Sequence, residues 1–396
     1  MEINGFDERL GAIPMGSNGF VSNGAHRVAV ASVLGLKVAI EKSPERSHPY
    51  DQEFLLSIGL SPQFIDLALL ETARAVKETR FLVLFDSDQR TKTKLRRHLR
   101  LQGLLWGYKD IELSIVGQRR LIFELYGHNE WFTYELVDQL VEERMSSPES
   151  QITFFQIDNR RVGDFQALKE RLREEFLGSR FPRKLHGTDG ESDSSNLAEL
   201  VYSKGGRVFL NTAPLRSEDQ TLKRFADLDL PVKGHLNEWV VSGSTVLELH
   251  GGRQAADLDL IFSPQSNPRS SNQNYDCHNT YVSLNPFPLE MLVYGSHMFF
   301  VYRGIKFLSK SVVLSIKIYL GGEKNSQDVY SSLTLSEAQT PSVELAAGML
   351  KIRKIRARRM RWIARLEWGA KRLPVPVENF LRKAVRLARK IGRQVS

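Results

Sequence analysis

Short apolar runs alternate with charged, amphipathic segments across residues 51–335, and this alternation constrains the fold more than any other feature of the sequence. Runs such as 81–85 (FLVLF) and 257–262 have the length and composition of strands. Between such runs, segments such as 91–102 and 165–177 carry their apolar residues at helical spacing. The alternation predicts a layered α/β (α+β) fold in this part of the chain.

The length of the chain, 396 residues, exceeds one ordinary hydrophobic core, so two or three domains are expected. We expect an N-terminal element at 1–50, an α/β middle domain at 51–180, a second α/β domain at 181–335 and a basic helical tail at 336–396. The hydrophilic segment 187–195 is a candidate linker or helix start. Expected strands are 81–85, 104–113, 152–157, 207–210, 238–241, 257–262 and 298–302. Expected helices are 28–34, 91–102, 135–145, 165–177, 196–204, 244–250, 289–294, 312–320, 345–368 and 377–393.

The composition is that of a globular protein in a reducing compartment. Apolar content is 41% and charged content is 26%, which argues against a disordered chain. Cys277 is the single cysteine, so no intrachain disulfide can form. The sequence has neither a secretory signal nor the roughly 20 uninterrupted apolar residues of a membrane span. We therefore expect a cytoplasmic protein that is not integral to a membrane.

Positive charge is concentrated near the C-terminus. Residues 349–396 hold 16 lysines and arginines against two glutamates, a net +14, which leaves −5 for the rest of a chain whose net charge is +9. Within 377–393 one helical face is apolar and most of the remainder is basic, a pattern typical of helices that lie on anionic membranes or in partner grooves. We rank a membrane surface first as the partner of this tail, RNA second, and packing on the protein's own body third.

The strongest chemical signal lies in 238–262 (EWVVSGSTVLELHGGRQAADLDLIF). Gly243 and Ser244 follow an apolar strand and open a short helix, where free backbone N–H groups and the helix dipole favour a phosphate. Asp257 and Asp259 are two residues apart on a predicted strand, so both carboxylates point to the same face. Two such carboxylates attract Mg²⁺ or Mn²⁺, and the segment therefore predicts metal-assisted phosphoryl or nucleotidyl transfer.

Several cations and one histidine are further candidates for contacting substrate. Arg303 and Lys306 lie beside a predicted strand and are candidate phosphate clamps. Lys317 and Lys324 are weaker candidates, for which a solvated helix face is the alternative. For His278 the alternatives are orienting a phosphate and a purely structural polar role.

The segment 238–262 resembles the motif of the nucleotidyltransferase fold, in which a Gly-Ser or Gly-Gly turn precedes an Asp-x-Asp strand. It is also similar to the Gly-Gly…Gly-Arg…Asp-x-Asp run of tRNA CCA-adding enzymes and bacterial poly(A) polymerases. The matching residues are Gly243, Gly252, Arg253, Asp257 and Asp259. This match makes Arg253 a candidate for substrate binding. Leu247-Glu248 replaces the Arg-Asp dipeptide of that run, and this departure counts against chemistry on RNA tails.

Two further segments, 186–214 and 276–310, resemble uncharacterised nucleotidyltransferase-like proteins encoded among bacterial capsule and surface-polysaccharide genes. A related group transfers alditol phosphate or phosphocholine from CDP-linked donors to glycans. The resemblance implies a nucleotidyltransferase-like mixed sheet with a third carboxylate from a later strand. Asp276 is the candidate because it precedes the β-like run 280–283, and Glu290, in a predicted helix, is the alternative.

The N-terminal element carries Asn23-Gly24-Ala25-His26-Arg27 at the start of a predicted helix. Backbone N–H groups at a helix start, beside a histidine and an arginine, form a plausible anion site. The surrounding sequence resembles the ParB/sulfiredoxin-like superfamily, whose Gly-x-His-Arg turn binds nucleotide phosphates. That resemblance implies a nucleotide or phosphate site at Asn23, Gly24, His26 and Arg27. Ala25 stands where sulfiredoxins need a cysteine, so their redox activity is not expected.

The carboxylate motif and the basic tail, together with what the resemblances imply, lead us to expect a metal-dependent nucleotidyl- or phosphoalditol-transferase that acts in surface-glycan biosynthesis, at the cytoplasmic face of the membrane. Its partners would be a nucleotide or nucleotide-linked donor, a glycan acceptor and, through the tail, an anionic membrane surface. Asp257 and Asp259 would hold the metal, while Asp276 would complete the metal site or act as base. The alternatives are an RNA nucleotidyltransferase and a non-catalytic nucleotide-binding protein.

Overall fold

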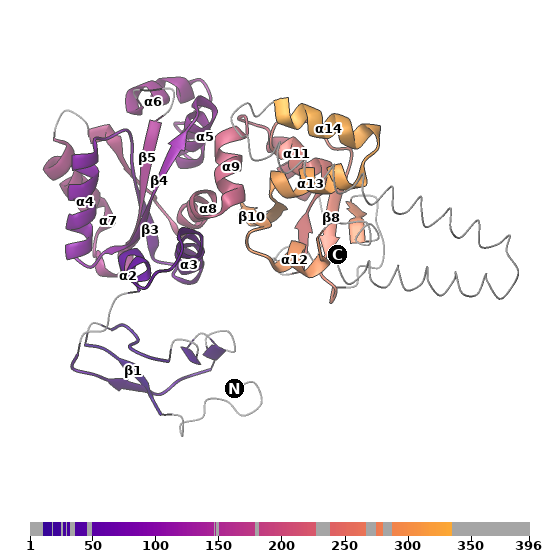
Figure 1. Cartoon of the computed structure of the whole chain (residues 1–396). Helices are drawn as coiled ribbons and strands as arrows, with labels where there is room; N and C mark the ends of the chain where they lie inside the picture. Colours follow the sequence, from indigo (N-terminus) through magenta and orange to yellow (C-terminus); the bar gives the residue numbers. More distant parts are fainter. Residues whose placement is uncertain are drawn as a thin grey trace, which may run out of the picture. The chain divides into compact units, whose positions relative to one another are not determined.

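A computed structural model shows a mixed α/β protein that separates into two compact units (Figure 1). The first unit comprises residues 1–113 and 124–202, and the second comprises 114–123 and 203–396. The structure describes residues 11–17, 19–24, 27–28, 30–31, 36–45, 50–145, 147, 150–178, 182–226, 238–266, 275–279 and 287–334. The two tail helices predicted at 345–368 and 377–393 lie outside these residues, as does most of the helix predicted at 28–34.

The first unit is built on an antiparallel sheet with the order β4-β5-β3-β6. Its strands are β3 (Thr79–Leu84), β4 (Leu105–Leu113), β5 (Ser150–Asp158) and β6 (Leu185–Gly187). Its helices are α2 (Gln52–Ser57), α3 (Pro62–Ala75), α4 (Gln89–Leu101), α6 (Leu136–Arg144), α7 (Phe165–Leu172) and α8 (Glu191–Tyr202), with short turns η2 (Asn159–Arg161), η3 (Arg173–Leu177) and η4 (Pro182–Lys184). A separate two-stranded parallel sheet joins β1 (Ile13–Met15) to β2 (Ile40–Lys42).

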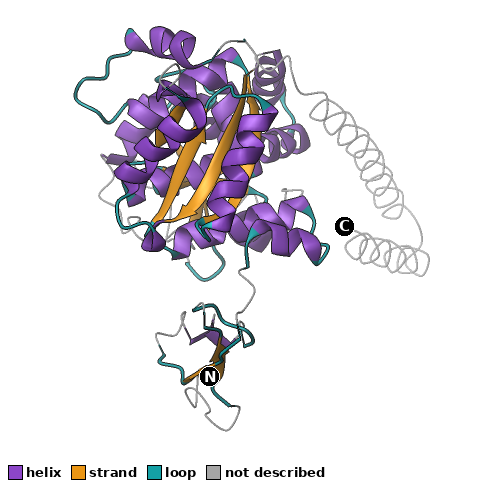
Figure 2. Cartoon of the chain, turned by 90° about the vertical axis from the view of Figure 1, so that its left-hand side faces the viewer, coloured by secondary structure: helices purple, strands orange, loops and turns teal. Residues whose placement is uncertain are grey.

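Alternation along the strands explains why helices cover both faces of this sheet, as Figure 2 shows. On β3, Leu82 and Leu84 pack in one hydrophobic cluster with side chains of α4 and α7. Phe81, which precedes Leu82 and therefore points to the other face of the sheet, places its ring against Tyr202 of α8. Both faces of the strand are buried, and this is why its centre is apolar at every position.

The second unit contains the segment with the strongest chemical signal, on a five-stranded mixed sheet of order β10-β11-β7-β8-β9. Its strands are β7 (Trp239–Val241), β8 (Leu258–Phe262), β9 (Tyr275–Cys277), β10 (Phe299–Tyr302) and β11 (Ile305–Leu308). Its helices are α9 (Lys204–Thr212), α10 (Asp219–Ala226), α11 (Gly243–Leu249), α12 (Leu289–Tyr294), α13 (Lys310–Leu320) and α14 (Glu323–Thr334). The antiparallel pairing of β7 with β8 brings the end of β7 and the start of β8 to the same edge of the sheet. Helix α11 begins at that edge.

Helix α5 (Ile115–Tyr126) is divided between the units, and its first part belongs to the second one. The reason is Arg120, which is fully buried. Its guanidinium donates to the carboxylate of Glu218 at 2.7 Å and to the hydroxyl of Tyr302 at 2.8 Å. A buried cation requires such partners, so this part of α5 is anchored in the second unit.

Most predicted elements occur within a residue or two of their expected ends, and one has the wrong type. The run 207–210 was expected to be a strand but lies inside α9. The side chain of Ser203 caps this helix by accepting from the N–H of Gly206 at 2.9 Å. Phe209 and Leu210 are buried in the core of the unit, and a short apolar run of this kind does not distinguish a strand from a buried helix face. The predicted boundary at 180/181 falls between η3 and β6, inside the first unit.

Candidate active site

The Gly243-Ser244 turn is shaped by its contact with Asp259. Gly243 has φ +62°, a left-handed conformation that side chains rarely adopt. A Cβ atom at this position would overlap the carboxylate of Asp259. The glycine is therefore required twice, by the backbone conformation and by the close approach of β8.

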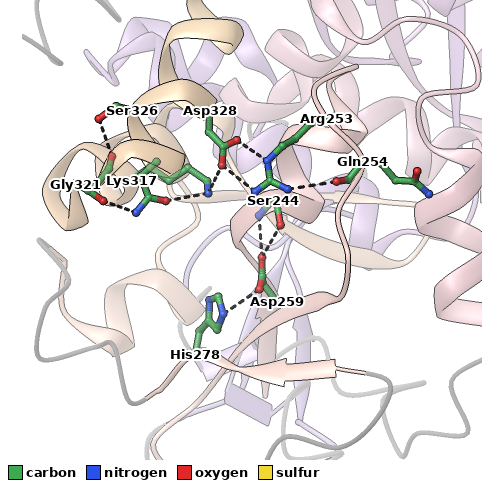
Figure 3. Close-up of polar contacts among 11 residues, drawn as sticks. Ser244, Arg253, Gln254, Asp259, His278, Lys317, Gly321, Ser326 and Asp328 are labelled. Atoms are coloured by element: carbon green, nitrogen blue, oxygen red, sulfur yellow. Dashed lines mark hydrogen bonds and ion pairs between the residues drawn. The ribbon is translucent and has the colours of Figure 1, made fainter.

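Asp259 caps the helix that the turn begins (Figure 3). Its Oδ2 atom accepts from the backbone N–H of Ser244 at 2.8 Å and from the Ser244 hydroxyl at 3.2 Å. Ser242, the residue at the N-cap position, makes no capping hydrogen bond with its side chain. A carboxylate from β8 thus replaces the local cap, and it lies near the positive end of the helix dipole.

Strand β9 brings two more polar side chains to the same point. Asp276 stands opposite Asp259 in the parallel pairing of β8 with β9. His278, the residue after β9, places its Nε2 atom 2.9 Å from Oδ1 of Asp259 and 3.5 Å from Oδ2 of Asp276. One ligand atom from each of the three residues lies within 4.8 Å of the others, a spacing at which they could hold one metal ion.

The electrostatics of this cluster favour a charged Asp259 paired with a protonated His278. Burial by itself raises the pKa of Asp259, but the hydrogen bond and charge of His278 and the Ser244 contacts outweigh it, and the pKa is lowered. Burial lowers the pKa of His278, yet the hydrogen bond and charge of Asp259, with the charges of Asp276 and Asp257, raise it above its ordinary value. A positive charge is therefore stabilised between the carboxylates.

Asp257 lies outside this three-residue group, and the strand on which it was expected begins one residue later. Strand β8 begins at Leu258, so Asp257 precedes the strand, and it is exposed. Its backbone carbonyl accepts from the Thr245 hydroxyl at 3.0 Å. In the parts of the chain that the structure describes, the metal-capable group around Asp259 includes Asp276 and His278 but not Asp257. The side chain of Asp257 contributes to the site through its charge.

Arg253 is held by an acidic residue of α14 (Figure 3). Its guanidinium donates to both carboxylate oxygens of Asp328, at 2.6 and 3.1 Å. Lys317, also a candidate, donates to the same carboxylate at 2.7 Å. Asp328 is buried, so the two cations compensate its charge and tie the loop before β8 to α13 and α14.

Arg303 and Lys306 were predicted to clamp phosphates, but the sheet topology separates them from the carboxylates. Arg303 and Gly304 form the tight turn between β10 and β11, both with positive φ. Because β11 runs parallel to β7, this turn lies at the opposite edge of the sheet from Gly243. Lys306 is buried, donates to the carbonyl of Val293 and lies over the ring of Phe299.

The two remaining sequence candidates are solvent-exposed. Glu290, the alternative third carboxylate, is exposed on α12, and Lys324 is exposed on α14. Among the described residues, the metal-capable group around Asp259 does not include Glu290.

The N-terminal motif is described in part. The side chain of Asn23 accepts from the N–H of Gly24 at 2.7 Å, and Gly24 has φ +84°. Arg27 donates to the carbonyl of Gly11 at 2.8 Å, so its guanidinium helps to hold the element together. His26 lies outside the described residues.

Sequence reasoning missed Glu248 as an organiser of the site. Its buried carboxylate accepts from the Thr221 hydroxyl, from Arg224 and from the backbone N–H of Ala255. These bonds fix the loop that leads from α11 into β8. The sequence had marked this residue only as a departure from an Arg-Asp dipeptide. His278 was considered only for orienting a phosphate or for a structural role, and its spacing of two residues from Asp276 was a usable signal of their proximity.

A second metal-capable group lies in the first unit, where His128, Asp189 and Asp193 approach one another near the start of α8. The side chains of His128 and Asp189 are exposed, and the Nε2 atom of His128 is 3.9 Å from an oxygen of each aspartate.

Among the residues described, no helix combines the length and apolar content needed to cross a bilayer. Comparison of the chain with protein-family models, curated proteins and solved structures gave no match.

Proposed function

We propose that this chain is a metal-dependent nucleotidyl- or phosphoalditol-transferase that modifies a surface glycan at the cytoplasmic face of the membrane. The observation that carries the proposal is the convergence of Asp259, Asp276 and His278 beside the Gly243-Ser244 turn. Charged groups are expensive to gather in a partly buried place unless opposite charge compensates them, and a bound cation would supply such charge between these carboxylates.

The carboxylates of Asp259 and Asp276 fit a divalent cation. Oδ2 of Asp259 is held by Ser244, which leaves Oδ1 facing Asp276 and His278. Mg²⁺ or Mn²⁺ is commonly bound by one or two carboxylates together with substrate phosphates, and these two residues would hold it here. When bound, the cation neutralises charge on the donor phosphates and on the leaving group.

The reaction that this site supports is displacement at phosphorus. A hydroxyl oxygen of the glycan acceptor attacks a donor phosphorus and forms a new P–O bond. The bond to the leaving group breaks, releasing pyrophosphate from a nucleoside triphosphate or CMP from a CDP-linked alditol. We assign the hydroxyl proton to Asp276, whose side chain is 43% exposed and thus the most accessible of the three.

The choice of a glycan acceptor and a membrane location comes from the sequence. It is supported by the resemblance of 186–214 and 276–310 to proteins encoded among surface-polysaccharide genes, and by the +14 charge of 349–396. Each lysine or arginine near an anionic leaflet contributes about 1 kcal/mol of attraction, so the tail carries enough charge for peripheral attachment.

A transfer assay tests the proposal. The full chain would be incubated with Mg²⁺ or Mn²⁺, a panel of nucleoside triphosphates and CDP-linked alditols, and glycan acceptors, and release of pyrophosphate or CMP would be measured. Asp276→Asn should reduce turnover on the order of 100-fold or more, because it removes both a ligand of the cation and the acceptor of the hydroxyl proton. Glu290→Gln, which removes an exposed acid in the same unit, is the matched control. Equal activity of the Asp276→Asn variant and the control would refute the assignment.

One rival has a specific observation in its favour. The N–H and hydroxyl of Ser244 are both engaged by Asp259, and Arg253 is engaged by Asp328, so groups predicted to meet substrate already have internal partners. A non-catalytic nucleotide-binding protein would show this arrangement. Nucleotide binding that needs no metal and survives Asp259→Asn would favour that rival.

A further inference from the structure

The Nε2 atom of His278 occupies a position that the proposed metal site would otherwise leave to solvent or substrate. It lies 2.9 Å from Oδ1 of Asp259 and 3.5 Å from Oδ2 of Asp276. All three atoms face one another within the 4.8 Å spacing of a shared ligand set. A ring nitrogen aimed between two carboxylates either carries a proton there or binds the cation that replaces it.

We propose that His278 is the third protein ligand of this metal, and that its imidazole makes the site select a divalent transition-metal ion such as Mn²⁺ over Mg²⁺. This inference rests on the metal site of the proposed function. Mg²⁺ takes oxygen ligands and keeps much of its water, whereas the divalent transition metals, from Mn²⁺ onward, bind nitrogen increasingly well, and Mn²⁺ also suits carboxylate oxygens. A site with two carboxylate oxygens and one nitrogen is therefore matched to Mn²⁺ and its heavier neighbours.

The surrounding contacts fix which atoms are left for the metal. Asp259 Oδ2 accepts hydrogen bonds from the N–H and the hydroxyl of Ser244, whereas Oδ1 lies against His278, so Oδ1 is the atom that Asp259 would offer the metal. Asp276 and His278 each add one atom, giving three protein ligands. The other coordination positions would remain for water and donor phosphates, as a transfer reaction requires.

Mn²⁺ binding to the full chain, followed by electron paramagnetic resonance, tests the selection. Free Mn²⁺ gives a sharp signal that is lost on binding, so titration gives the Kd, and competition with Mg²⁺ gives the affinity for that ion. His278→Gln should weaken Mn²⁺ binding by at least roughly tenfold, since even outer-shell partners of a metal ligand contribute 10–100-fold. The affinity for Mg²⁺ should change less than the affinity for Mn²⁺. Nitrogen hyperfine coupling to bound Mn²⁺ should be present in the wild type and absent in His278→Gln.

All measurements would be made with His128→Gln as the background, because His128, Asp189 and Asp193 form another metal-capable group. His297→Gln, at an exposed histidine of the same unit, is the matched control for loss of an imidazole. Circular dichroism would show that each variant is folded. Equal losses of Mn²⁺ and Mg²⁺ affinity in His278→Gln, or bound Mn²⁺ without nitrogen coupling in the wild type, would overturn the inference.

The failure of this inference is distinguishable from failure of the proposed function. If Asp259→Asn abolishes metal binding while His278→Gln lowers the affinities for Mn²⁺ and Mg²⁺ by the same factor, the carboxylate metal site is supported and only the role of His278 is wrong. If Asp259→Asn leaves metal binding unchanged, the carboxylates do not form a metal site, and both proposals fail.

Discussion

Replacement of Gly243 by alanine separates the two reasons why the site needs a glycine. The backbone φ of +62° disfavours any side chain by about 1–2 kcal/mol. The new Cβ would also displace the carboxylate of Asp259, which accepts from the N–H and the hydroxyl of Ser244. Loss of one hydrogen bond to a charged group costs about 1.5–3 kcal/mol, so with the conformational cost the total loss should be about 2.5–5 kcal/mol.

Gly304→Ala is a matched control. Gly304 has φ +76°, but a Cβ there meets no atom within 4 Å, so only the conformational term of about 1–2 kcal/mol applies. Hydrogen–deuterium exchange of the amides in β7 and β8 measures the local free energy of opening for each variant. The exchange measurement suits this chain because two compact units need not unfold in one transition.

A double-mutant cycle completes this test. In an Asp259→Ala background the carboxylate is gone, so Gly243→Ala should lose less stability than it does in the wild type. The Cβ of residue 259, 2.7 Å from the new Cβ, should still keep this loss above that of Gly304→Ala. If Gly243→Ala lowers the free energy of opening by no more than Gly304→Ala does in the wild-type background, the contact between the turn and Asp259 contributes no stability. The argument for an organised carboxylate site would then lose its structural basis.

Three further predictions concern the groups that support the site. Glu248→Ala should destabilise the second unit by about 3–5 kcal/mol, measured by exchange at β8, because the partly buried Arg224, the buried Thr221 hydroxyl and the Ala255 N–H lose their acceptor. Asp328→Asn should lose about 1.5–3 kcal/mol because Lys317 stays buried without its anion, and a variant as stable as wild type would contradict this. The raised pKa of His278 adds stability that is complete below its ordinary pKa of 6.5 and is lost as the pH rises through the raised value. Unfolding free energy should thus fall above about pH 6.5 in wild type, and His278→Gln should show a flatter profile if the pair with Asp259 is responsible.

The local parts of the site could be predicted from the sequence because they depend on neighbouring residues. The Gly243-Ser244 turn, its strand and its helix follow from apolar periodicity and from the position of one glycine. The same reasoning placed Asp257 on β8 beside Asp259, and it was wrong by one residue, since strand ends are the least certain feature of such predictions.

The assembly of the cluster could not be predicted in this way because it depends on pairing between distant segments. Asp276 meets Asp259 only because β9 pairs in parallel with β8, a choice that no local pattern specifies. The same long-range pairing places the turn at Arg303 at the opposite edge of the sheet. Arg253 illustrates a further limit, since its partner Asp328 lies on a helix that was not predicted at all.

Binding of nucleotide donors with and without metal tests the central claim most directly. Isothermal titration would compare nucleoside triphosphates and CDP- and UDP-linked donors on the wild type, Asp259→Asn, Asp276→Asn and Asp257→Asn, each with Mg²⁺, Mn²⁺ or neither. We expect donor binding that requires metal, is lost in Asp259→Asn and Asp276→Asn, and is weakened less in Asp257→Asn, whose side chain stands outside the cluster. Donor binding that is independent of metal and unchanged in all three variants would contradict the assignment of a metal-dependent transferase site to this cluster.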